Sequence, residues 1–237
     1  MTLLPAEREV AVDIARRLIA IDPFAPAVSI VSSPSSEARV QQLFVYLAQA
    51  TIEDDLPVHC RFADTRVLPS LLARLSAGQA ARVAIDVRGW SWIDHLGKAA
   101  SWRPSLQSPA VEADGERHVV LSVVQLDAML ASSEPDTMFD LLLENTPELV
   151  PAEGRGRFRD RLGDILASAD ARSVEAPNDR LQFIVLALGF GETFHNDAGL
   201  QATWGGIATR QTTLVEAMKT WDDAFWKRLE MRRAGPP

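Results

Sequence analysis

The spacing of apolar residues differs between the two halves of this 237-residue chain. In the first half, short apolar runs rich in β-branched residues alternate with amphipathic helical stretches, an order typical of an α/β layer. In the second half, apolar residues recur mainly at helical spacing. The stretch RPSLQSPAVEADGER, residues 103–117, has two prolines, a glycine and no helical period. We therefore predict an α/β lobe over residues 1–105, a linker over 106–117 and a helical lobe over 118–237.

Strands and helices are expected to alternate in the first half. The strands are predicted from apolar residues that alternate along the chain or are β-branched, and the helices from apolar residues three or four positions apart. Ser33 is the expected N-cap of the second helix, with Pro34 at its first position, and Gly89 is expected to end the third strand. The predicted helices span residues 6–21 and 33–50 and start again near residue 69, and the predicted strands span residues 27–32, 58–62 and 83–87.

The second half is expected to be helical after one further strand in HVVLSVV, residues 118–124. In the last predicted helix, Met218 and Phe225 belong to an apolar stripe, and Trp226 lies beside that stripe. Trp204 falls in a glycine-flanked stretch, ATWGGI, that we interpret as a turn. The predicted helices cover residues 124–133, 136–146, 155–171, 178–195 and 210–231.

Composition excludes several classes of partner. The net charge of −8 and the pI near 5.1 argue against a nucleic-acid-binding protein, which needs a basic surface. No apolar run approaches the roughly 20 residues of a membrane span, and the first residues lack the basic and apolar regions of a signal peptide. Cys60 is the only cysteine, so no disulfide can form within the chain. We expect a cytoplasmic protein with no membrane or nucleic-acid partner.

No group of residues has the spacing of a catalytic or metal site. His59 and Cys60 are neighbours in a predicted strand, so their side chains point to opposite faces and cannot form a nucleophile–base pair. Asp94 and His95 are not accompanied by a serine in a nucleophile elbow. No two of the four histidines have the i, i+4 spacing of a helical zinc site. We therefore expect a protein that is not an enzyme, with no catalytic residue, metal or cofactor.

The stretch RFADTRVL, residues 61–68, places two arginines around an aspartate where a predicted strand passes into a helix. The Asp64 carboxylate can accept hydrogen bonds from the free backbone N–H groups of such a corner, and it can pair with Arg61 or Arg66. Paired charges at a corner between two elements usually fix the turn. We interpret Arg61, Asp64 and Arg66 as a structural motif, with a binding site for a substrate or anion as the alternative.

The same stretch carries a resemblance to a known family. The segments SIVSSPSSEARVQQLFVYLAQA and LPVHCRFADTRVLPSLLARLSAGQ resemble the bacterial type VI secretion effector-adaptor family, also called effector chaperones. That family has a small-residue strand, a helix and an arginine-phenylalanine-x-aspartate-proline-arginine-valine-leucine core before a leucine-rich helix. Thr65 stands where proline is usual, and Ala63 where an aromatic residue is usual. The matching residues are Arg61, Phe62, Asp64, Arg66, Val67 and Leu68.

The resemblance implies a function as well as a fold. Members of that family have an α/β lobe followed by a helical lobe, have no catalytic activity, hold the N-terminal region of a toxic effector and help load it onto the valine-glycine-repeat spike. Because such effector regions tend to be apolar helices, we expect one to bind in a cleft between the two lobes that has an apolar floor. The best lining candidates are expected on the helical lobe. The candidate partner-binding residues are Trp204, Met218, Phe225 and Trp226; the alternative is that the tryptophans complete the core.

Two other classes of function remain open from the sequence. An immunity protein would bind the catalytic domain of a toxin and block it, and would leave the N-terminal segment of the toxin free. A small hydrolase would require His59 with Cys60, or Asp94 with His95, to be a functional catalytic dyad.

Overall fold

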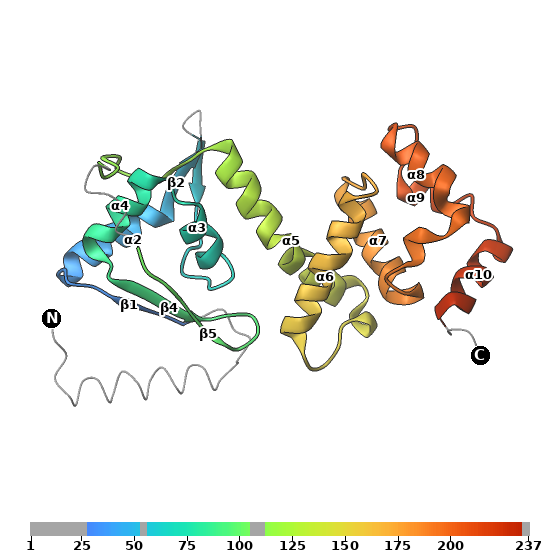
Figure 1. Cartoon of the computed structure of the whole chain (residues 1–237), viewed down its shortest axis with the longest axis horizontal. Coiled ribbons are helices and arrows are strands. Elements are labelled where there is room, and N and C mark those ends of the chain that lie inside the picture. The colour runs from blue at the N-terminus through green and yellow to red at the C-terminus, as the bar shows by residue number, and fades with distance from the viewer. Residues whose placement is uncertain (1–27, 53–55, 105–111, 234–237) are drawn as a thin grey trace. The chain divides into compact units, whose positions relative to one another are not determined.

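The computed structural model describes residues 28–52, 56–104 and 112–233, and the chain divides into two compact units, Met1–Ser133 and Glu134–Pro237 (Figure 1). The described part of the first unit contains two small sheets together with helices, and the described part of the second unit contains helices without strands. This confirms the predicted fold class, an α/β lobe followed by a helical lobe.

The first unit holds two three-stranded sheets. In one sheet, β4 lies between β1 and β5 and is antiparallel to both. In the other sheet, β2 is central, antiparallel to β3 and parallel to β6. The strands are β1 (Ser29–Ser32), β2 (Gln49–Ile52), β3 (Leu56–His59), β4 (Gly89–Ile93), β5 (Ala99–Trp102) and β6 (Val120–Leu121).

Apolar side chains from sheets and helices form the core of this unit. Leu43 and Leu47 lie one helical turn apart and are almost completely buried. Beside them, the rings of Phe44, Phe62 and Trp90 form a cluster with centroids 5.3, 5.8 and 5.9 Å apart. The helices that contribute to the unit are α2 (Glu37–Ala48), α3 (Leu68–Arg74), α4 (Ala77–Asp86) and the first part of α5 (Val123–Asn145).

The strand predicted over residues 83–87 is wrong, because all but the last of these residues belong to α4. The Ser76 hydroxyl accepts a hydrogen bond from the Gln79 N–H at 3.2 Å, and the Gln79 side chain accepts one from the Ser76 N–H at 2.8 Å. This capping box starts the helix. Val83 is fully buried, whereas Ile85 is 45% exposed, as expected for opposite faces of a helix. Three alternating apolar residues are too few to distinguish the two-residue period of a strand from the 3.6-residue period of a helix.

Other boundaries in the first unit also differ from the expectation. Strand β4 begins at Gly89, which was predicted to end a strand. Helix α2 has Ser36 as its N-cap residue in place of Ser33, whose hydroxyl accepts a hydrogen bond from the Ser35 N–H at 3.0 Å. Strands β2 and β5 were not predicted. The helix predicted over residues 6–21 lies outside the described residues.

The division between the units falls at Ser133/Glu134, whereas the sequence predicted a linker over residues 106–117. Strand β6 pairs with β2, and this pairing keeps the residues after the predicted linker in the first unit. Asp114, within the described part of that linker, accepts a hydrogen bond from the Tyr46 hydroxyl at 2.6 Å and donates its N–H to the Gly78 carbonyl at 3.0 Å. The contacts of Asp114 therefore tie the described end of this stretch to the first unit.

The second unit is a set of short helices around one apolar core. The two stretches predicted as separate helices on either side of Pro135 form one helix, α5. Helix α7 ends at Phe190 because Gly191 has a φ of 98°, a conformation that favours glycine. The predicted last helix is divided into α9 and α10. The helices are α6 (Arg155–Asp170), α7 (Pro177–Phe190), α8 (Gln201–Ala208), α9 (Leu214–Met218) and α10 (Asp223–Arg233), with 3₁₀ turns at Pro147–Leu149, Phe194–Asn196 and Ala198–Leu200.

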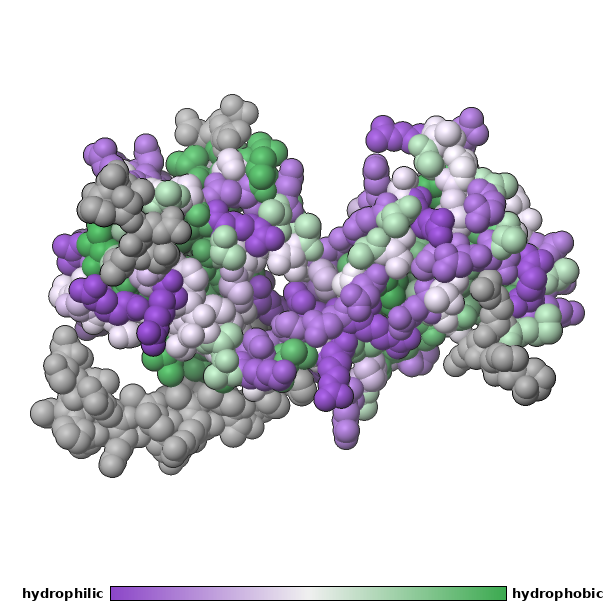
Figure 2. Space-filling model, viewed as in Figure 1, coloured by the Kyte–Doolittle hydropathy of each residue, from purple (hydrophilic) through white to green (hydrophobic). Residues whose placement is uncertain are grey.

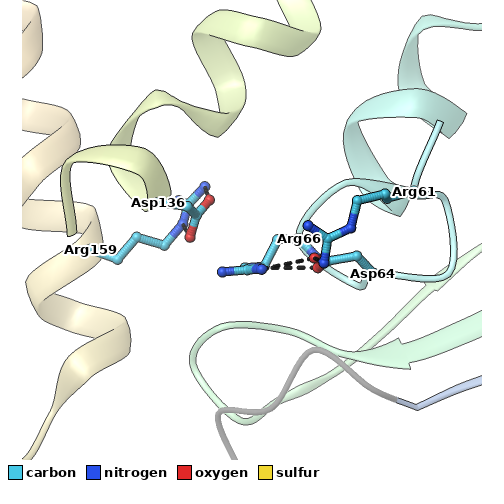
Figure 3. A network of polar contacts seen from close by, with 5 residues as sticks. All are labelled: Arg61, Asp64, Arg66, Asp136 and Arg159. Atoms are coloured by element: carbon cyan, nitrogen blue, oxygen red, sulfur yellow. Dashed lines mark hydrogen bonds and ion pairs between the residues drawn. The ribbon is translucent and has the colours of Figure 1, made fainter. Parts of the chain in front are cut away.

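Charged side chains connect the helices of the second unit. Arg180 on α7 is 8% exposed and donates hydrogen bonds to both carboxylate oxygens of Glu134 on α5, to Asp170 on α6 and to the Val174 carbonyl. Arg159 on α6 holds the carboxylate of Asp136 on α5 through two hydrogen bonds of 2.9 Å (Figure 3). These bidentate pairs fix the packing of α5, α6 and α7.

Candidate partner-binding site

The corner between β3 and α3 is held together by Asp64, as Figure 3 shows. Its carboxylate accepts hydrogen bonds from the Arg66 backbone N–H at 2.9 Å and from the Arg66 guanidinium at 3.1 and 2.9 Å. Arg61 approaches the same carboxylate at 3.5 Å. The structure thus brings together the three residues that the sequence grouped as a structural motif.

The backbone of the corner closes around the same residue. The Asp64 carbonyl accepts hydrogen bonds from the N–H groups of Val67 and Leu68 at 3.0 and 2.9 Å, and this turn leads directly into α3. Burial alone would raise the pKa of Asp64, but the hydrogen bonds from Arg66 and the positive charges of Arg66 and Arg61 outweigh it and lower this pKa below its ordinary value. The carboxylate is therefore ionised and fully engaged within the corner.

An apolar groove lies beside this corner, between α3 and the first part of α5. Its volume is about 220 Å³. Leu126 and Met129 are half-buried on α5, and Leu130 on the same helix is 57% exposed. We call this feature the α3–α5 groove. It is lined by Val58, His59, Cys60, Arg61, Arg66, Val67, Ser70, Leu121, Leu126, Met129, Leu130 and Ser133.

The polar groups of the α3–α5 groove are few. Ser70 is 7% exposed, and its hydroxyl has no hydrogen-bond partner among the described residues. Burial raises the pKa of the Cys60 thiol to about 11, so Cys60 is an unreactive thiol at neutral pH. The guanidinium of Arg61 is largely exposed at the edge, and the residues that line the groove include no carboxylate. The groove therefore suits an apolar group with a polar atom beside it that can form a hydrogen bond with the Ser70 hydroxyl.

The sequence-predicted partner residues lie elsewhere, in the second unit. Trp204 is inside helix α8, where a turn was predicted; it is 5% exposed, and its indole N–H donates to the His195 carbonyl at 2.9 Å. Phe225 is 8% exposed. Both side chains belong to the core of the second unit. They have little surface with which to contact a partner.

Trp226 and Met218 are half-buried and pack against the same core. The ring of Trp226 lies 5.8 Å from that of Phe190 and 5.0 Å from that of Trp221. These contacts place Trp226 at the edge of the core. The four predicted residues thus share one core and form no open apolar surface among them.

The α3–α5 groove was missed because its residues come from two segments far apart in the sequence. A signal was nevertheless present at the start of α5, where Val123, Val124 and Leu130 add apolar residues beyond one helical face. These three side chains are 49%, 77% and 57% exposed. In Figure 2, strongly hydrophobic residues also reach the surface of the first unit at several places.

The described residues contain no group of three or more histidine, cysteine, aspartate or glutamate side chains that could hold a metal ion. Within the same residues, every helix is too short or too polar to cross a membrane.

Comparison with known proteins gives one match. Residues 6–82, about a third of the chain, match the family described as Domain of unknown function (DUF4123). The matched segment runs through β1, α2, β2, β3 and the Asp64 corner into α4. No curated protein and no solved structure matches the chain.

Proposed function

We propose that this protein is a non-catalytic adaptor that holds the N-terminal region of a type VI secretion effector and helps load it onto the secretion spike. The resemblance of the Arg61–Leu68 stretch to the effector-adaptor family supports this proposal. The family match over residues 6–82 covers the same stretch, although that family is described without a function.

The observation that carries the proposal is the α3–α5 groove. Exposed apolar side chains that gather around a concave site usually contact a partner. Leu130 stands at this groove, and Val123 and Val124 are exposed at the start of the same helix. An apolar effector segment bound in the groove would remove the Leu130 side chain from water together with its own apolar surface. Such binding keeps an aggregation-prone segment in solution.

Co-expression tests the proposed function and separates it from that of an immunity protein. The chain would be expressed with a tagged full-length effector, with the effector lacking its N-terminal region, and with the toxin domain alone. Adaptor function predicts that the chain co-purifies with the full-length effector. It also predicts that the chain no longer co-purifies when the N-terminal region of the effector is removed. Retention by the toxin domain alone would contradict the proposal and favour an immunity protein.

The groove itself is tested by Leu130→Gln, with Met231→Gln as the matched control. Both residues are exposed apolar side chains on helices, 57% and 67% exposed, but Met231 lies in the second unit. Because more than half of Leu130 is exposed in the free protein and would be covered by a bound segment, Leu130→Gln should weaken effector binding about tenfold and change the melting temperature little. Met231→Gln should change neither. Equal affinities of the two variants, measured by calorimetric titration, would place the effector elsewhere.

A further inference from the structure

Among the described residues, strand β3 is an edge of its sheet, and no described strand pairs with its outer side. The Thr51 N–H donates to the Val119 carbonyl at 3.0 Å, so Thr51 directs its main-chain groups toward β6. Thr51 of β2 lies opposite Pro57 of β3. Two positions away on each strand, Gln49 lies opposite His59. Because main-chain direction alternates along a strand, Pro57 and His59 direct their groups away from β2. The outer edge therefore presents the carbonyls of Pro57 and His59 and the N–H of His59.

Two recesses adjoin this edge. The α3–α5 groove includes Val58, which faces the helices. A second recess, with a volume of about 380 Å³, includes Pro57, whose side chain points to the face of the strand opposite that of Val58. Both recesses share Val58 and His59. An extended chain beside β3 would place alternate side chains in the two recesses, because successive side chains of a strand point to opposite faces.

Each recess also contains a buried polar atom that no described residue satisfies. In the α3–α5 groove it is the Ser70 hydroxyl, and in the second recess it is Nδ1 of His118. Serine in a helix commonly bonds the carbonyl four residues earlier, but Ser70 does not. An unpaired buried polar group is unfavourable in the free protein, and a ligand that pairs with it removes this cost.

We propose that the effector segment binds as an extended strand added to the outer edge of β3. This inference rests on the proposed adaptor function and specifies the form of the bound segment. The residue opposite His59 exchanges main-chain hydrogen bonds with it and directs a polar side chain toward His118. The residues on either side of it place apolar side chains in the α3–α5 groove, where a polar atom of the segment forms a hydrogen bond with the Ser70 hydroxyl. Pro57, which has no N–H, limits pairing with unrelated strands at the same edge.

The main test compares His59→Pro with His59→Ala in the full-length chain. Proline removes the outward N–H of His59, which no described strand of the protein uses, whereas alanine removes the side chain alone. The probes are overlapping synthetic 15-residue peptides that cover the N-terminal region of the effector. Strand addition predicts that His59→Pro weakens binding of the best peptide about tenfold relative to His59→Ala, with both variants folded by circular dichroism. Equal binding by the two variants would overturn the proposal.

Ser70→Ala provides a measurement that remains informative if His59→Pro fails to fold. Removing an unpaired buried hydroxyl should leave the melting temperature unchanged or raise it, while peptide binding weakens about three- to tenfold. A structural role for Ser70 would lower the melting temperature and leave affinity unchanged, and that result would contradict the proposed contact.

The form of the peptide is tested by N-methylation of one backbone amide at a time. A bound strand predicts loss of affinity at every second position. Losses that cluster at every third or fourth position would indicate a helix in the groove and overturn strand addition. Co-purification of the effector with unchanged affinity for His59→Pro would overturn only strand addition. Failure of the effector and all its peptides to bind the wild-type chain would overturn the adaptor function as well.

Discussion

The two units of this protein differ in how many large apolar side chains they expose to solvent. Among the described residues, nine large apolar side chains are exposed in the first unit and three in the second. The second unit buries Trp204 and Phe225, the residues whose aromatic character most suggested partner contacts from the sequence. The first unit leaves Val124 and Leu130 exposed on α5. The aromatic side chains of Trp204 and Phe225 therefore belong to the core of the second unit, whereas the exposed apolar side chains on α5 of the first unit are aliphatic.

Buried polar groups are present in both units. In the second unit, the buried guanidinium of Arg180 is satisfied by two carboxylates and a carbonyl. In the first unit, the buried Ser70 hydroxyl, Trp90 Nε1 and His118 Nδ1 have no described partner, and in the second unit the same holds for His195 Nδ1. A network that is fully satisfied stabilises a fold, whereas unsatisfied groups beside a recess are available to a ligand. Unsatisfied buried groups therefore occur in both units, and those of Ser70 and His118 lie beside the two recesses of the first unit.

The largest effect that would sharpen this comparison is expected from Arg180→Ala. Loss of the guanidinium leaves Glu134 partly buried without its partner, which should cost the second unit about 3–5 kcal/mol. Scanning calorimetry should show a lower unfolding temperature for the second unit and an unchanged transition for the first. Arg210→Ala is the matched control, because Arg210 and Glu175 form an ion pair with both side chains highly exposed, and it should have almost no effect. A uniform shift of both transitions would show that the units do not unfold independently.

A smaller effect is expected from Asp64→Ala in the first unit. The change removes the hydrogen bonds that close the corner before α3 and should cost about 1–3 kcal/mol. Arg61→Ala is the control and should cost much less, because Arg61 is largely exposed and only 3.5 Å from the carboxylate. Urea unfolding monitored by tryptophan fluorescence measures both. An unchanged unfolding midpoint for Asp64→Ala, combined with lost effector binding, would favour a binding role for Asp64.

The Asp64 contribution also has a defined dependence on pH. Its pKa in the folded protein is lowered, so the stabilisation is present above the unfolded value near 3.9 and is lost as pH falls through the folded value. Wild type and Asp64→Ala should therefore differ in stability at pH 6 and converge in strong acid. A difference that persists below both pKa values would point to a steric origin.

The smallest effect is expected at His195 in the second unit. Burial, followed by the nearby charge of Arg172, lowers the pKa of this histidine below 6.5. The unfolded chain consequently binds more protons between the folded pKa and 6.5, so stability is lost as pH falls through that interval. The unfolding temperature of the second unit should decrease between pH 7 and pH 5, and His195→Gln should reduce this decrease. An identical pH dependence in the variant would assign the effect to other groups.

The sequence predicted those features that depend on neighbouring residues. The Asp64 corner was found because Asp64 and Arg66 are two positions apart and form their contacts within one turn. Helices α6 and α7 were predicted because their apolar residues repeat regularly over several turns. Short patterns failed: the alternation of Val83, Ile85 and Val87 predicted a strand, but the cap at Ser76 and the burial of one face produce a helix.

The sequence by itself determined the order of an α/β unit and a helical unit, the corner that joins β3 to α3, and the absence of any spacing typical of a catalytic site. Only the tertiary structure decided that β6 joins β2, that Trp204 is buried, and that the segment from β3 to α3 meets α5 around an apolar groove. The physical reason is the range of the interactions. Caps, turns and periodicity are set by residues a few positions apart, whereas burial and strand pairing depend on contacts between residues some 70 positions apart, as for Thr51 and Val120.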